Sequence, residues 1–253
     1  MGRDVRIVFL TTDDPQYLPA FFERVLAERA GDTALVASVP PLYKNQSARQ
    51  AAWRYYRTFG LRDTAVLAWR TAVAKAKRQS VASACRHHGV PHAFTPDVNA
   101  PTFLDELRSL GTDVIVSVSC PQIFRRPLIE VPAEGCLNVH GALLPQYRGI
   151  LPSFWMLANG ERRAGVSVYF VNEQIDAGDL CAQRAFDVSP DETLDEFLTR
   201  SKRIAAELVL QALADIECGT VERRRLDLSQ GSYYSWPDAA AVERFRTAGR
   251  RIW

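Results

Sequence analysis

The sequence lacks any run of about eighteen consecutive apolar residues, which is roughly what a helix needs to cross a bilayer. The apolar stretch nearest its start, Val5 to Leu10, is short, and no cleavable signal region follows it. These absences predict a cytoplasmic protein that has no membrane partner.

Cysteines are few and scattered. There are five of them, an odd number, with no C-x-x-C spacing, and this argues against both a disulfide framework and a zinc site. Cys136 lies close in sequence to His140, so a nucleophilic cysteine remains an alternative. His87 and His88 have no carboxylate or cysteine spaced to join them, and we therefore expect no metal site.

Glycine is missing from the turn after the first predicted strand, residues 11–14. This excludes a dinucleotide fingerprint or a phosphate loop at that point. The turn nevertheless follows the carboxyl end of a first strand, where open α/β sheets bind ligands. We therefore expect Thr12 or Asp13 to contact substrate, with ordinary helix capping as the alternative.

Acidic residues are nearly absent between Lys44 and Arg86, where ten Lys and Arg residues accompany one acid, Asp63. The whole chain carries a formal charge of only +2, so a nucleic-acid partner is not favoured. Interleaved aromatic residues make two interpretations reasonable. The segment is either a pair of solvated helices or a surface for an anionic acceptor molecule.

Short apolar strands alternate with amphipathic helices along the chain, which is typical of an α/β fold. We predict one Rossmann-like domain over residues 1–218, with a largely parallel central sheet and helices on both faces. Residues 219–253 should form a short ordered extension, because their aromatic density is too high for a disordered tail. The predicted strands cover residues 5–10, 33–39, 113–119, 136–139 and 165–171, and the predicted helices 16–30, 47–58, 63–87, 101–110, 152–159 and 194–218.

One strand carries an amide and an imidazole two residues apart, Asn138 and His140, whose side chains should point to the same face. An amide can hold a developing oxyanion, and an imidazole can move a proton near neutral pH. An acidic turn after the next strand could bring Asp176 to the imidazole. A hydrogen-bonded loop histidine without a catalytic role is the alternative.

Several motifs around these residues resemble the 10-formyltetrahydrofolate-dependent formyltransferase family. The resemblance covers residues 111–184 closely and the chain from residue 5 more loosely. It rests on NVHGALLPQYRG at 138–149, NGE at 159–161, GVSV at 165–168 and DAGD at 176–179.

The resemblance implies a Rossmann-like formyltransferase that uses 10-formyltetrahydrofolate, with Asn138, His140 and Asp176 carrying the transfer. It also implies that Gln122, Ile123, Phe124 and Ile175 hold the folate and that Tyr147 lies at the acceptor side. Gly141-Ala142 replaces the Pro-Ser of many members and resembles the branch that formylates nucleotide-linked amino sugars. The glycine-free first turn argues against glycinamide ribonucleotide as the acceptor.

Three other functions stay open. A hydrolase could use the same residues with water in place of the amine, and a folate or nucleotide sensor could bind without turnover. Another amine, such as a natural product or a methionyl-tRNA-like acceptor, is a further alternative. An enzyme for initiator tRNA is expected to carry a second domain, which about 35 residues after Cys218 cannot build. The expected partner is a small anionic amine, and a homodimer is compatible with the sequence.

Overall fold

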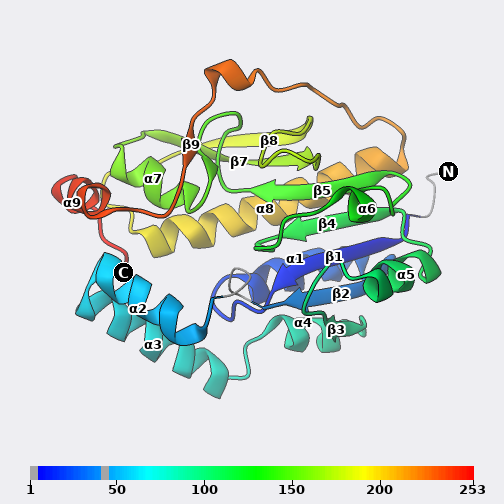
Figure 1. Ribbon diagram of the computed structural model, residues 1–253, viewed down its shortest axis with the longest axis horizontal. Coiled ribbons are helices and arrows are strands. Elements are labelled where there is room, and N and C mark those ends of the chain that lie inside the picture. The colour runs from blue at the N-terminus through cyan, green and yellow to red at the C-terminus, as the bar shows by residue number, and fades with distance from the viewer. Residues whose placement is uncertain (1–4, 41–45) are drawn as a thin grey trace.

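A seven-stranded sheet forms the centre of the protein, as the computed structural model shows (Figure 1). The structure describes residues 5–40 and 46–253. The strand order is β3-β2-β1-β4-β5-β7-β8, and the first five of these strands are parallel to one another. Strand β7 runs antiparallel to β5, and β8 runs antiparallel to β7. The strands are β1 (Ile7–Thr12), β2 (Thr33–Val39), β3 (His92–Phe94), β4 (Val114–Val118), β5 (Gly135–His140), β7 (Arg163–Phe170) and β8 (Leu180–Asp187).

The central strands are buried along their whole length. Every residue of β1 and β4 is buried, as expected for parallel strands covered by helices on both faces. Strand order reverses between β1 and β4, because β2 and β3 extend the sheet from β1 while β5 extends it from β4. Ligands of open α/β sheets bind at such a switch point, beyond the carboxyl ends of the strands.

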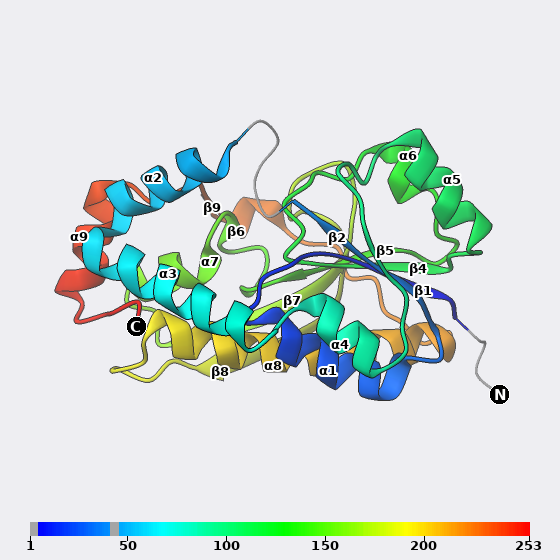
Figure 2. The ribbon, with the colours of Figure 1, turned by 90° about the horizontal axis from the view of Figure 1, so that it is seen from below.

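Helices cover both faces of the sheet (Figure 2). On one face, α1 (Leu18–Arg29), α4 (Val81–His87) and α8 (Leu194–Glu217) pack side by side and share the largest apolar cluster with the sheet. On the other face, α5 (Pro101–Ser109) and α6 (Arg126–Ile129) contribute to a second cluster. The predicted fold class is confirmed.

A third apolar cluster lies at the end of the sheet toward which β1 runs (Figures 1 and 2). It joins α7 (Pro152–Ala158) and α8 to the C-terminal helix α9 (Ala239–Thr247) and to Phe59 of α2 (Ala48–Phe59). The segment before α9 contains η1 (Leu228–Gln230) and β9 (Tyr233–Tyr234), and β9 pairs with β6 (Arg148–Gly149). The 219–253 segment thus contacts the loop that follows β5; the predicted domain boundary itself stays a prediction. No helix in the described part of the chain is long and apolar enough to cross a membrane.

The prediction of one continuous helix over residues 63–87 is wrong. The chain forms α3 (Leu61–Ala76), breaks, and restarts as α4. Arg78 adopts a positive φ of 55°, and Ser80 caps α4 by accepting the backbone N–H of Ser83. The apolar spacing continued through the break, so periodicity alone missed it. Lys44 and Asn45, the first two residues of the basic segment, lie outside the described residues.

Candidate active site

Strand β5 carries the two candidate catalytic side chains. Its backbone pairs with parallel β4 on one side and antiparallel β7 on the other, which fixes its register and depth in the sheet. Asn138 is half-buried and His140 is 5% exposed. As predicted from their spacing of two, the alternation of the strand turns both side chains to one face.

The hydrogen bonds of His140 determine its tautomer. Nε2 lies 2.8 Å from the backbone oxygen of Tyr147. Because a carbonyl oxygen can only accept, Nε2 must carry a hydrogen. Nδ1 is therefore the nitrogen that gains or loses a proton, and it lies 3.6 Å from Oδ1 of Asp176. The predicted pairing of the imidazole with the acidic turn is present.

Asp176 is held in the turn between β7 and β8 by backbone contacts. Its Oδ2 accepts the N–H of Gly149 at 2.8 Å, and its own φ is +48°, an uncommon conformation for a residue other than glycine. The turn closes tightly against β7, because a Cβ on Gly178 would overlap the carbonyl oxygen of Phe170. This glycine requirement explains how the turn folds back far enough to place a carboxylate beside His140.

Tyr169 links Asn138 to Asp176, and sequence reasoning missed it. It lies opposite Asn138 in the β5–β7 register. Its hydroxyl donates to Oδ1 of Asp176 at 2.8 Å and accepts from Nδ2 of Asn138 at 3.0 Å. Burial raises the Tyr169 pKa well above the ordinary value, so this hydroxyl keeps its proton. Only the strand register could have identified it.

The loop after β5 contributes a backbone carbonyl to the candidate site. The backbone oxygen of Tyr147 accepts a hydrogen bond from His140. The Tyr147 hydroxyl donates to Glu161 at 2.6 Å, and its ring stacks on Tyr234. Tyr147 and Leu151 both have positive φ values, 56° and 53°. Such conformations are typical of functional loops, where the surrounding structure compensates for the strain. Contact between the Tyr147 ring and an acceptor stays a prediction.

The loop after β4 is pinned in place by Gln122, whose side chain accepts the N–H of Val98 and donates to the oxygen of Pro96, both at 2.9 Å. Ile123 is 64% exposed, whereas Phe124 is 6% exposed and belongs to the core. On the other side of β5, Ile175 is 46% exposed beside Asp176. Among the predicted folate contacts, the two isoleucines are therefore the accessible apolar side chains, and Phe124 packs in the core beneath the loop.

Beyond the end of β1, the two predicted substrate contacts differ in character. Thr12 is 9% exposed, and its hydroxyl oxygen is buried without a hydrogen-bond partner among the described residues. Asp13 is exposed, and its Oδ1 accepts the backbone N–H of Val81 at the start of α4. Their contact with substrate stays a prediction. Asp13 does not cap α1, the helix that follows it, and bonds instead to the first N–H of α4.

The sequence analysis missed a lysine at the same edge, because this lysine lies in a helix whose apolar pattern predicts only a packing role. Lys202 extends from α8 and donates to the hydroxyl of Ser119, at the carboxyl end of β4, over 2.7 Å. Burial lowers the Lys202 pKa to about 8, and the nearby Asp14 carboxylate partly opposes that change. An amine and a hydroxyl thus meet at the switch point.

The chain is similar to known proteins in sequence and in fold. A sequence model described as formyl transferase matches residues 5–213. The chain belongs to the formyl transferase family. The methionyl-tRNA formyltransferases of Trichlorobacter lovleyi and Geobacter metallireducens are 34% and 35% identical to this family member over 146 and 140 residues. Those alignments cover 58% and 55% of this chain and 46% and 45% of the relatives, so the chain spans about half their length.

Solved structures share the fold at low sequence identity. The N-formyltransferase of Helicobacter canadensis, in complex with folinic acid and dTDP-3-aminofucose, has a TM-score of 0.63 and 14% identity, covering 96% of this chain and 80% of that one. A sugar N-formyltransferase from a Shewanella species has a TM-score of 0.60 and 16% identity, covering 92% of this chain and 78% of that one. Glycinamide ribonucleotide transformylase 1 of Symbiobacterium toebii has a TM-score of 0.61 and 18% identity, covering 88% of this chain and 94% of that one.

Proposed function

We propose that this protein transfers a formyl group from 10-formyltetrahydrofolate to the amine of a small anionic acceptor, a nucleotide-linked amino sugar. The observation that carries the proposal is the continuous hydrogen-bonded group of Asn138, Tyr169 and Asp176 beside Nδ1 of His140. Membership of the formyl transferase family supports the chemistry.

The side chains supply what acyl transfer to an amine needs. Asn138 Nδ2 has two hydrogens, and the contact with Tyr169 uses one, which leaves the other for negative charge developing on the formyl oxygen. His140 Nδ1 and Asp176 together can accept the proton that the attacking amine must lose. The hydrogen on His140 Nε2 is committed to Tyr147, so the ring cannot swing away without losing that bond.

The surroundings of this group fit a flat apolar ligand that carries the formyl carbon. Ile123 and Ile175 are exposed on the two loops that follow the strands beside β5. Exposed large apolar side chains next to a polar site commonly mark a ligand surface. Two side chains stiffen the loop: Gln122 bonds to residues 96 and 98, and the Asn99 carboxamide accepts the N–H of Arg125 and donates to the oxygen of Ile123.

The acceptor would enter at the switch point between β1 and β4. The unpaired Thr12 hydroxyl and the Lys202 amine are suited to the polar, anionic part of such a molecule. The N-formyltransferase of Helicobacter canadensis, whose structure contains dTDP-3-aminofucose, supports the nucleotide-sugar class. The relatives described as methionyl-tRNA formyltransferases favour a second candidate, an aminoacyl-tRNA acceptor.

A product assay separates these functions. The protein is incubated with monoglutamyl 10-formyltetrahydrofolate and, in parallel, with nucleotide-linked amino sugars, methionyl-tRNA or no amine. We expect amine-dependent loss of the formyl donor and a formylated sugar nucleotide. Formate release without an amine would identify a hydrolase, and donor binding without turnover would identify a sensor. A thermal-shift screen of nucleotide sugars would select the acceptor.

A further inference from the structure

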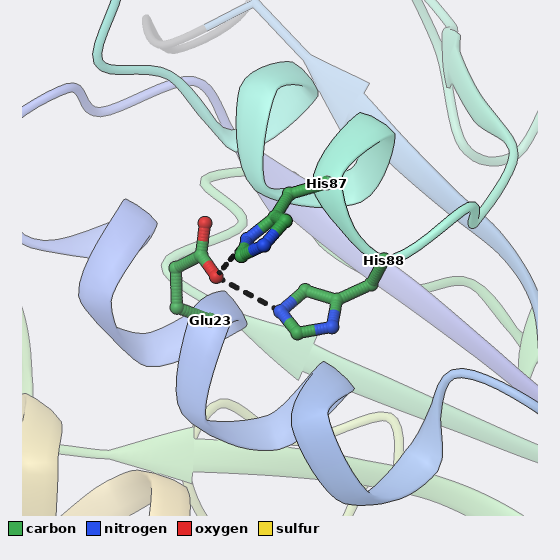
Figure 3. A group of neighbouring side chains, drawn as sticks. All are labelled: Glu23, His87 and His88. Atoms are coloured by element: carbon green, nitrogen blue, oxygen red, sulfur yellow. Dashed lines mark hydrogen bonds and ion pairs between the residues drawn. The ribbon is translucent and has the colours of Figure 1, made fainter.

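A group of potential metal ligands lies on the sheet face that α1, α4 and α8 cover, and it uses no residue of the candidate active site. Oε2 of Glu23 is 2.9 Å from Nδ1 of His87 and 2.8 Å from Nε2 of His88 (Figure 3). The three donor atoms lie within 4.8 Å of one another. The expectation that no carboxylate would join these histidines is therefore wrong, because Glu23 comes from α1, more than sixty positions away in sequence.

We propose that Glu23, His87 and His88 form a binding site for a borderline divalent transition-metal ion, with zinc as the best-suited ion and water as the remaining ligand. Two imidazoles and one carboxylate with an open position are a recurrent donor set for zinc. Magnesium and calcium, by contrast, require mainly oxygen donors.

The separations of the donor atoms need little change to hold such an ion. In a tetrahedral site with metal–donor bonds of about 2.0 to 2.1 Å, neighbouring donors lie about 3.3 Å apart. The present separations of 2.8 and 2.9 Å would therefore widen by about 0.5 Å. Glu23 and His87 can supply this movement because their side chains are 44% and 70% exposed.

The backbone that carries the ligands is rigid. Phe22 and Val25 of α1 and Ala84 and Cys85 of α4 are buried in the same apolar cluster, on either side of the ligand group. His88 caps α4, and its side chain is only 18% exposed. A preorganised backbone of this kind lowers the entropic cost of binding.

Binding of a cation replaces the two hydrogen bonds that His87 and His88 now make to Glu23. In their present contacts, both rings donate to a carboxylate oxygen, so each must move that hydrogen to its other nitrogen before binding metal. For His87 this exchange can occur through water, because the ring is exposed.

A bound ion would connect this surface to the loop at the switch point. Helix α4 is about 10 Å long at 1.5 Å per residue, and its first backbone N–H, on Val81, bonds to Asp13. The ion would clamp the other end of the same helix to α1. Metal binding should therefore stabilise the packing of α4 and, through it, the position of the Asp13 loop.

The test uses the full chain after removal of metal by a chelator. Zinc titrated calorimetrically should bind with one equivalent at micromolar affinity or tighter and should raise the melting temperature, while magnesium should do neither. Glu23→Gln and His88→Gln should each weaken zinc binding at least about tenfold, the smallest effect typical of disturbing a metal site. Glu28→Gln, on the same helix but outside the ligand group, is the matched control and should bind as the wild type does.

Cobalt provides the check on ligand identity. If Glu23→Gln or His88→Gln fails to fold by circular dichroism, His87→Gln replaces it, since that ring is the most exposed of the three. The cobalt-loaded wild type should show a four-coordinate visible spectrum without sulfur-to-metal absorption. Three results would overturn the proposal: no zinc-dependent stabilisation, unchanged binding in the folded variants, or a thiolate band that assigns the metal to cysteine. None of these results depends on formyl transfer.

Discussion

The hydroxyl of Tyr169 donates to Oδ1 of Asp176 at 2.8 Å, and this same oxygen faces Nδ1 of His140. One carboxylate oxygen thus meets both the tyrosine that contacts Asn138 and the histidine that must handle a proton. We expect Tyr169→Phe to lower kcat about three- to tenfold, the rate equivalent of one hydrogen bond, with little change in either KM. Because Tyr169 acts by positioning Asp176 and Asn138, the pH–rate profile should also shift. An unchanged kcat and profile would show that the hydroxyl serves only the fold.

The three polar residues of the site should have far larger effects. Asn138→Ala, His140→Ala and Asp176→Ala should each reduce turnover by at least about a hundredfold, since removing one donor to an oxyanion costs this much. Their combined effects should fall well short of additive, because all three act on one reacting centre. Asp105→Ala, an exposed side chain on α5, is the control and should leave turnover unchanged. Near-normal turnover in His140→Ala would refute the mechanism.

The loop after β4 should govern the formyl donor rather than the acceptor. Ile123→Asp places a charge on an exposed apolar side chain that we assign to the folate surface. The donor KM should rise several-fold more than the acceptor KM, with no loss of stability. Phe124→Ala should instead lower the free energy of unfolding by about 3 to 5 kcal/mol, because Phe124 is in the core. Equal KM changes in Ile123→Asp would exclude this assignment.

Lys202 should give acceptor binding a pH dependence. Its pKa is lowered to about 8, so the ammonium is charged below that pH and becomes neutral as pH rises through it. An anionic acceptor bound by the ammonium should therefore show a rising KM above pH 8, and the donor KM should not follow. Lys202→Met should remove this rise while leaving the donor KM unchanged. If the rise persists in the variant, another group binds the acceptor.

The basic helices α2 and α3 allow a test with salt. Arg57 and Arg62 are exposed, whereas Arg54 stacks over the ring of Trp236 at 4.0 Å and belongs to the packing. If exposed cations attract the acceptor, its KM should rise between low and physiological salt, where the screening length falls to about 8 Å. Reversing Arg57 and Arg62 to Glu should remove most of that rise, and Arg108→Glu on α5 should not. Monoglutamyl donor must be used, because polyglutamate is itself anionic. Acceptor binding that does not depend on salt would show that these helices are a solvated surface and do not bind the acceptor.

The sequence by itself determined the features that depend on local spacing. Buried apolar runs separated by amphipathic helices specify a largely parallel sheet, and a spacing of two on a strand specifies that Asn138 and His140 share a face. The acidic turn at Asp176 was also visible, since its glycine and its distance from His140 accompany the family motifs. The first two features follow from periodicity and residue type, and the third from the family resemblance; none of the three requires knowledge of distant neighbours.

Only the tertiary structure decided which distant residues meet. Tyr169 reaches Asn138 and Asp176 because β7 pairs with β5 in one register, and a shift of one residue would turn its ring to the opposite face. Lys202 reaches Ser119 because α8 packs on the sheet next to the end of β4. Glu23 reaches His87 and His88 because α1 and α4 pack together on the same sheet face. Phe124 is buried while its neighbour Ile123 is exposed, which depends on what lies beneath the loop. Packing and register are properties of the whole chain, so no local pattern encodes them.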